Sequence, residues 1–166
     1  AYGGFTAGTG FDRPNGQGTF WQLTSATRYA ANCTGPCTPG GLVLPALAAL
    51  AARFPIVAVS NGNAHVGRVG LGQYFVDAVH ASEYGVAKPD ARIFHAAARL
   101  AGVASADVLH VGDDATLDVL GALGAGMQAV WVNRVQQTWI HPEQPHHTVE
   151  NLTDLVESLI VRVPSS

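Results

Sequence analysis

The sequence contains few charged residues, which make up only 13% of its 166 positions. Nine basic and twelve acidic side chains give a formal charge of −3 at pH 7. A chain of this charge has no broad positive field to attract phosphate backbones or anionic membrane surfaces. We therefore expect neither nucleic acid nor a membrane among its partners.

Long apolar runs are also absent. The longest, residues 42–52, has about half the roughly 20 residues that a membrane-spanning helix needs, and Pro45 lies inside it. The first residues show neither the basic nor the apolar region of a secretion signal. These features favour a cytoplasmic protein with one compact domain, present as a monomer or homodimer.

Cysteine and lysine are the scarcest of the reactive residue types. The two cysteines, Cys33 and Cys37, supply too few ligands for a tetrahedral zinc site, so a structural or incidental role is expected. Lys88 is the only lysine, the other eight basic residues being arginines. The surroundings of Lys88 are therefore of special interest.

The chain divides near residue 40 into two parts of different composition. Residues 1–40 hold eight glycines and three charged residues without a sustained period, which is typical of irregular structure. Within them, residues 19–23 are a short apolar piece that could form a strand. Residues 41–166 are expected to form the folded core.

From Gly41 onward, helical periods alternate with short β-type runs. We expect strands over residues 56–60, 78–81, 108–111 and 128–132, helices over 42–53, 90–101 and 115–125, and a final helix capped by Asn151. This alternation predicts an α/β fold with a doubly wound parallel sheet.

Polar residues follow the expected strands where each strand ends. Ser60 and Asn61 end the first of these strands, Asp113 and Asp114 follow the third, and Lys88 lies in a loop between them. Because ligands collect at the carboxyl ends of the strands in such sheets, these residues are expected to share one site.

The acidic residues Asp113, Asp114 and Asp118 lie close together in the sequence. Carboxylates crowded at one strand end repel unless a cation or a lysine compensates them, and hard oxygen ligands favour Mg²⁺ over zinc. An alternative is that such acids cap the following helix. Likewise Ser60 and Asn61 suit either anion binding or a turn, and Lys88 suits either a phosphate contact or a solvated loop.

The ordered set of these motifs resembles the last three signature motifs of the haloacid dehalogenase-like (HAD) hydrolases. The matching segments are residues 57–62 (VAVSNG), 85–90 (GVAKPD) and 110–114 (HVGDD) with Asp118. The resemblance implies a Rossmann-like domain that hydrolyses a small phosphorylated substrate through an aspartyl-phosphate, with Mg²⁺ as cofactor.

The same resemblance implies roles for the site residues. Ser60, with Asn61 beside it, would contact a phosphoryl oxygen, and Lys88 would face the nucleophile and the phosphate. Asp113 would bind the metal, with Asp114 and Asp118 as ligand, water holder or partner of the lysine. The metal-free dehalogenases of the family usually carry serine and asparagine in this last motif, so the acidic version favours a phosphatase.

The defining first motif of the family, an apolar strand ending in Asp-x-Asp, does not occur in this sequence. The only aspartate before Ser60 is Asp12, and no apolar strand leads into it. The expected core therefore lacks its usual first strand, and three explanations stay open. The chain could be a C-terminal fragment that lost this strand and most of the cap domain, residues 1–40 could supply the strand and a remnant of the cap, or the N-terminal sequence could be unreliable. Three functions stay open: a phosphatase, a non-catalytic fragment that keeps the pocket, and a dehalogenase.

Overall fold

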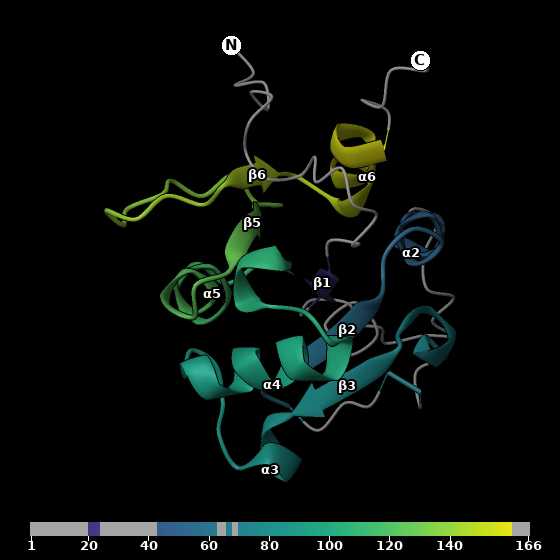
Figure 1. Ribbon diagram of the computed structural model, residues 1–166. Helices are drawn as coiled ribbons and strands as arrows, with labels where there is room; N and C mark the ends of the chain where they lie inside the picture. Colours follow the sequence, from purple (N-terminus) through teal and green to yellow (C-terminus); the bar gives the residue numbers. More distant parts are fainter. Residues whose placement is uncertain (1–19, 24–42, 63–65, 68–69, 161–166) are drawn as a thin grey trace.

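The computed structural model describes residues 20–23, 43–62, 66–67 and 70–160 (Figure 1). Its six strands form one parallel sheet in the order β3-β2-β1-β4-β5-β6. The strands are β1 (Phe20–Leu23), β2 (Ile56–Ser60), β3 (Asp77–His80), β4 (Val108–Gly112), β5 (Gln128–Val132) and β6 (His147–Val149). The chain runs outward from β1 to β3 and then returns to β4, so the predicted doubly wound α/β fold is confirmed.

The helices connect these strands. They are α2 (Val43–Ala51), α3 (Ala81–Tyr84), α4 (Ala91–Ala101), α5 (Gly121–Gly124) and α6 (Leu152–Ile160), with 3₁₀ turns η1 (Gly72–Tyr74) and η2 (Ser105–Asp107) and the π-helical segment η3 (Ala115–Leu120). Within the described residues, none of the helices has the length and apolar character needed to cross a membrane.

The central strand of the sheet is β1, which lies within the apolar piece at residues 19–23, so the alternative in which residues 1–40 supply this strand is confirmed and the expectation of a missing strand is wrong. Trp21 is in register with Ile56 of β2 on one side and with Leu109 of β4 on the other. Pairing on both sides satisfies the backbone groups of a four-residue segment that is too short to show a pattern of its own. Residues 1–19 and 24–42, including Asp12, Cys33, Cys37 and any cap remnant, lie outside the described residues.

Two apolar cores cover the two faces of the sheet. Alternate residues of β2 point to opposite faces: Ile56 joins the core beneath α2 and α6, and Val57 joins the core beneath α4 and α5. Leu47 of α2 and Phe94 of α4 are fully buried in these two cores. The sheet is therefore held rigidly between two helical layers.

Side chains and glycines of the sequence fix the boundaries of two helices. The Asp90 carboxylate accepts the backbone N–H of Arg92 at the start of α4, and Gly102 ends that helix with φ of 71°. Asn151 caps α6 as expected, accepting the N–H of Thr153 at 2.8 Å.

The sequence pattern was less accurate at two other elements. The helix expected over residues 115–125 is divided into η3 and α5, and the strand β6 was not expected. In η3 the N–H of Val119 bonds the carbonyl of Asp114, five residues back, which widens the first turn.

Gly121 is the point where α5 packs closely against α4 and the loop before it. A Cβ at Gly121 would lie 2.7 Å from Cζ of Phe94 and 3.1 Å from Cα of Pro89. We expect Gly121→Ala to lower the free energy of unfolding by about 1–3 kcal/mol, because a buried ring and backbone must move. Urea unfolding checks this. Gly124→Ala is the control, since a Cβ there meets nothing within 4 Å; equal losses in both variants would contradict the packing explanation.

Candidate active site

The three matched motifs meet at the carboxyl edge of the sheet, around its central strands. β2 ends at Ser60 and β4 ends at Gly112, and β1 lies between these two strands. The direction of winding reverses between β1 and β4, which is where open α/β sheets bind their ligands. The candidate site therefore lies at the topological switch point.

Lys88 is buried, with only 8% of the residue exposed, so it is not a solvated loop residue. Its Nζ donates to Oδ1 of Asp118 at 2.5 Å, and the Asp118 side chain is 3% exposed. The peptide bond between Lys88 and Pro89 is cis. The loop lysine and the acidic motif thus form one buried ion pair.

The Asn61 amide joins the serine motif to the lysine loop. Its Nδ2 donates to the carbonyl of Lys88 at 3.0 Å, and the N–H of Lys88 donates back to its Oδ1 at 2.7 Å. Ser60 is 9% exposed, and its Oγ accepts the N–H of Gly62 at 3.1 Å. The structure thus gives Asn61 a positioning contact with Lys88 and places Ser60 in a local turn.

The acidic residues take different structural parts. Oδ1 of Asp114 accepts the N–H groups of Thr116 and Leu117 at 3.0 and 2.8 Å, so Asp114 caps η3. Oδ2 of Asp118 accepts the N–H of Asp114 at 3.1 Å, while its Oδ1 binds Lys88. The capping alternative therefore describes Asp114, and both oxygens of Asp118 have partners.

These contacts bear on whether the residues fit the Mg²⁺ that the family resemblance implies. Among the described residues, no three His, Cys, Asp or Glu side chains converge as a metal site. Asp114 and Asp118 are engaged with backbone N–H groups and with Lys88, and the metal role expected of Asp113 stays a prediction. Mg²⁺ in proteins is usually held by one or two carboxylates together with waters and substrate phosphate, so one carboxylate at this edge of the sheet is compatible with the ion without defining its site.

The environment keeps Asp118 ionised. Burial by itself would raise the pKa of Asp118. The nearby His110 and Lys88 lower this pKa by more than burial raises it, so that it lies well below the ordinary 3.8. Nε2 of His110 lies 3.7 Å from Oδ1 of Asp118, which is beyond hydrogen-bond length, so Lys88 is the decisive partner. Burial lowers the pKa of His110, and the imidazole is neutral at pH 7.

Two further contacts of this site were missed by the sequence patterns. Nε1 of Trp131 donates to the backbone carbonyl of Asp113 at 3.1 Å. The ring of Trp139 packs edge-on against that of Trp131, with ring centroids 4.9 Å apart. A Cβ at Gly112 would overlap the side chain of Asp118. Gly112 thus makes room for the acid, and Trp131 fixes the peptide before Asp114.

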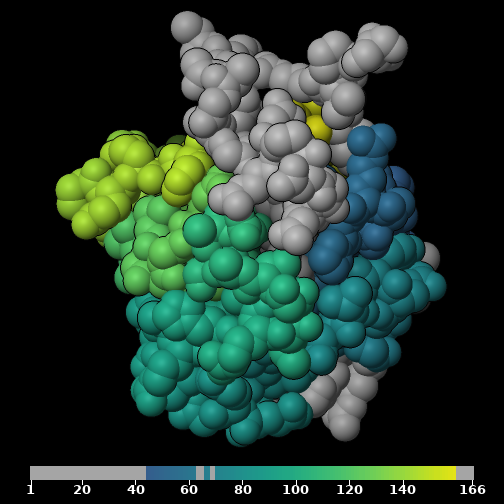
Figure 2. Space-filling model, in the orientation of Figure 1, coloured from purple at the N-terminus to yellow at the C-terminus, as the bar shows by residue number. Residues whose placement is uncertain are grey.

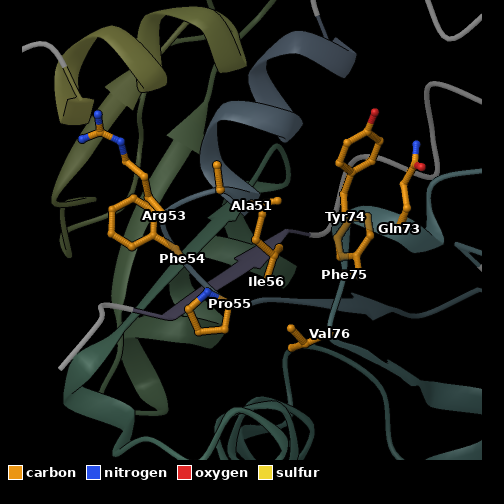
Figure 3. Close-up of a pocket in the computed structure, with 10 residues that line it drawn as sticks. Ala51, Arg53, Phe54, Pro55, Ile56, Gln73, Tyr74, Phe75 and Val76 are labelled. Carbon is orange, nitrogen blue, oxygen red and sulfur yellow. The ribbon is translucent and has the colours of Figure 1, made fainter. Parts of the chain in front are cut away.

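A pocket elsewhere in the molecule is not part of this site. It has a volume of about 320 Å³ and lies where β2 begins, between the end of α2 and η1 (Figure 3). Its lining includes Pro55, Ile56 and Tyr74 and none of the candidate site residues. The pocket opens at the amino end of β2, opposite the edge that carries Ser60.

The buried ion pair predicts a large stability effect. In Lys88→Met the Asp118 carboxylate stays buried without its cation, so we expect a loss of about 3–5 kcal/mol in the free energy of unfolding. Urea unfolding at pH 7 measures it. The control is Arg92→Gln, which removes the exposed pair with Asp90 and is expected to change little. Equal effects of the two substitutions would contradict the burial argument.

The lowered pKa of Asp118 also predicts how stability depends on pH. A carboxyl group whose folded pKa lies below its unfolded value stabilises the protein above the unfolded pKa and loses that contribution on acidification. We expect the stability difference between wild type and Lys88→Met/Asp118→Asn to fall as the pH drops below about 4, near the ordinary carboxyl pKa. Urea midpoints from pH 7 to pH 2 test it. A difference independent of pH would contradict it.

A family model described as haloacid dehalogenase-like hydrolase matches residues 23–126, more than half of the chain. Among curated relatives, a 5-amino-6-(5-phospho-D-ribitylamino)uracil phosphatase of Escherichia coli K12 is 40% identical over 110 residues, which cover 64% of this chain and 46% of the relative. The (S)-2-haloacid dehalogenase 2 of Pseudomonas sp. CBS-3 is 33% identical over 107 residues, 61% of this chain and 46% of the relative.

Solved structures agree with these matches. A 2-haloacid dehalogenase from Pseudomonas syringae pv. Tomato aligns with a TM-score of 0.69 and 40% identity, over 70% of this chain and 51% of that one. A HAD phosphatase from Thermococcus onnurineus aligns with a TM-score of 0.65 and 26% identity, over 70% and 56%. The chain thus spans about half the length of these relatives. From the family model, the relatives and the fold together, the chain belongs to the haloacid dehalogenase-like hydrolases.

Proposed function

We propose that this chain carries the site of a phosphatase-type hydrolase that acts on a small phosphate monoester. The observation that carries the proposal is the buried Lys88–Asp118 ion pair, 2.5 Å long, at the switch point of the sheet. Together with the two hydrogen bonds of Asn61, it joins the three motifs into one unit. The proposal also includes a cytoplasmic location, and the state of monomer or homodimer stays a prediction.

The groups of this site suit a phosphate. The Lys88 ammonium is held in place by Asp118 and would offset the negative charge of a phosphoryl group. Ser60 stands at the end of β2, where its hydroxyl would donate to a phosphoryl oxygen. In the family pattern an aspartate nucleophile takes up the phosphoryl group, which divides hydrolysis into two easier steps.

Magnesium enters the proposal as the cation that the family resemblance implies, with Asp113 as its ligand among the three acids. Bound there, a divalent cation would offset charge on the transferring group. The described residues show no cluster of three acidic or other metal-binding side chains that would define the site of the ion, and the roles given to Ser60, Asn61 and Lys88 do not depend on it.

The choice of a phosphatase over a dehalogenase rests on the acidic pair after β4. The relatives include both activities, so the family alone does not decide between them. Asp113 and Asp114 stand where the metal-free dehalogenases usually carry serine and asparagine. If the chain releases halide from a 2-haloacid and a chelator does not slow this release, the dehalogenase is favoured instead.

Binding without hydrolysis is a second candidate, and one observation favours it. In the family pattern the nucleophilic aspartate directly follows the central strand. Here β1 ends at Leu23, the sequence continues Thr24-Ser25-Ala26-Thr27, and the next acidic residue is Asp77. A site with the lysine but without the aspartate would bind a phosphate and release it unchanged.

We expect the purified chain, verified by intact mass, to hydrolyse p-nitrophenyl phosphate in a reaction that needs Mg²⁺ and is abolished by Lys88→Gln and by Asp113→Asn. Release of p-nitrophenol with and without chelator measures this. Arg92→Gln is the control and is expected to keep full activity, because Arg92 is exposed and its ion pair is with Asp90 rather than with any of the candidate site residues.

Two results would contradict the phosphatase. Turnover that survives both Lys88→Gln and Asp113→Asn would come from another site or another protein. No turnover, combined with calorimetric binding of inorganic phosphate that Lys88→Gln abolishes, would instead establish the non-catalytic candidate. If neither turnover nor phosphate binding is detected in the folded chain, both candidates fail.

A further inference from the structure

His110 is a buried ionisable residue to which the proposed function gives no role. It lies in the middle of β4, is 0% exposed, and neither of its ring nitrogens has a hydrogen-bond partner in the part of the chain that the structure describes. Buried polar atoms in proteins are nearly always paired, so two unpaired nitrogens in one ring need an explanation.

The imidazole lies directly behind the ion pair of the candidate site. Its Nε2 is 3.7 Å from Oδ1 of Asp118, the same oxygen that accepts Lys88. The other oxygen, Oδ2, is held by the N–H of Asp114. The carboxylate therefore has the ammonium on one side, a backbone donor on another, and the imidazole on the buried side.

Packing fixes where this ring can go. Phe94 of α4 lies edge-on to the imidazole, with ring centroids 5.0 Å apart and an interplanar angle of 74°. Since both rings are fully buried, the imidazole cannot swing away from Asp118. A neutral ring in this place can direct an N–H at the carboxylate without adding a second cation beside Lys88.

We propose that His110 is a positioning residue: from the buried side it holds the Asp118 carboxylate against Lys88, and so sets the place of the ammonium that faces the substrate phosphate. The second half of this statement rests on the proposed function, whereas the first half concerns the ion pair alone. The competing explanation is that His110 only fills space in the core next to Phe94.

The single lysine of the chain allows a direct test. Labelling with ¹⁵N-lysine gives one side-chain ammonium signal, that of Lys88, whose rate of hydrogen exchange with water reports how firmly Asp118 holds it. The matched variants are His110→Gln and His110→Met, which have nearly the same length and volume and differ in the presence of an N–H donor. Asp118→Asn shows the exchange rate of an ammonium without its carboxylate.

We expect the Lys88 ammonium to exchange about twofold faster in His110→Met than in the wild type, the low end of what one hydrogen bond gives, because the 3.7 Å contact is longer than a hydrogen bond. His110→Gln is expected to exchange at nearly the wild-type rate. Equal exchange rates in the Gln and Met variants, fast or slow, would overturn the proposal, because packing alone would then explain His110. If His110→Met does not fold, His110→Phe takes its place as the variant without an N–H donor. If His110→Gln does not fold, the proposal is overturned as well.

The readout separates this inference from the proposed function. Hydrogen exchange of Lys88 needs no substrate and no turnover, so it tests the ion pair in the free protein. If the Gln and Met variants differ as expected but the wild type neither binds inorganic phosphate nor hydrolyses p-nitrophenyl phosphate, His110 positions the pair and the proposed function is wrong. If the wild type binds phosphate but the variants do not differ, the proposed function stands and His110 is a packing residue.

Discussion

The ion pair between Lys88 and Asp118 is the interaction on which the rest of the candidate site depends. Two opposite charges that are almost completely buried tolerate no loss of either partner, because the remaining charge would stay in a poorly solvated place. The surrounding contacts serve this pair: Asn61 fixes the backbone of Lys88, and the N–H of Asp114 holds the second oxygen of Asp118. Three loops that are far apart in the sequence thereby behave as one rigid unit.

The position of β1 explains why this unit forms at all. As the strand between β2 and β4, it brings the serine motif and the acidic motif to adjacent places on the same edge of the sheet. The segment between β5 and β6, by contrast, stands out from the body of the molecule as a separate lobe, and its Ile140 is 80% exposed (Figure 2). Trp131 and Trp139 connect the base of this lobe to Asp113.

Much of the fold could be predicted from the sequence because its signals are local. The apolar runs of β2 and β5 gave the same bounds as in the structure, and Asp90 and Gly102 mark the ends of α4 by short-range contacts. β1 was indicated only as a short apolar piece and β6 was not expected, since strands of four and three residues are defined by their neighbours and show no period. Similarly, the spacing of Asp114 and Asp118 put both on one face of a helix, but only the three-dimensional arrangement separates a cap from a partner of Lys88. The roles of His110 and Trp131 depend on register between strands, which no local pattern contains.

Gly112 has an evolutionary consequence. A Cβ atom at position 112 would overlap the Cβ of Asp118 as well as its carboxylate, so the obstacle is any side chain at position 118 and not the acid alone. A descendant could therefore replace the acid by another residue and still be unable to accept alanine or serine at position 112. The glycine would outlast the acid, and a single substitution at position 118 would be enough to restore the acid.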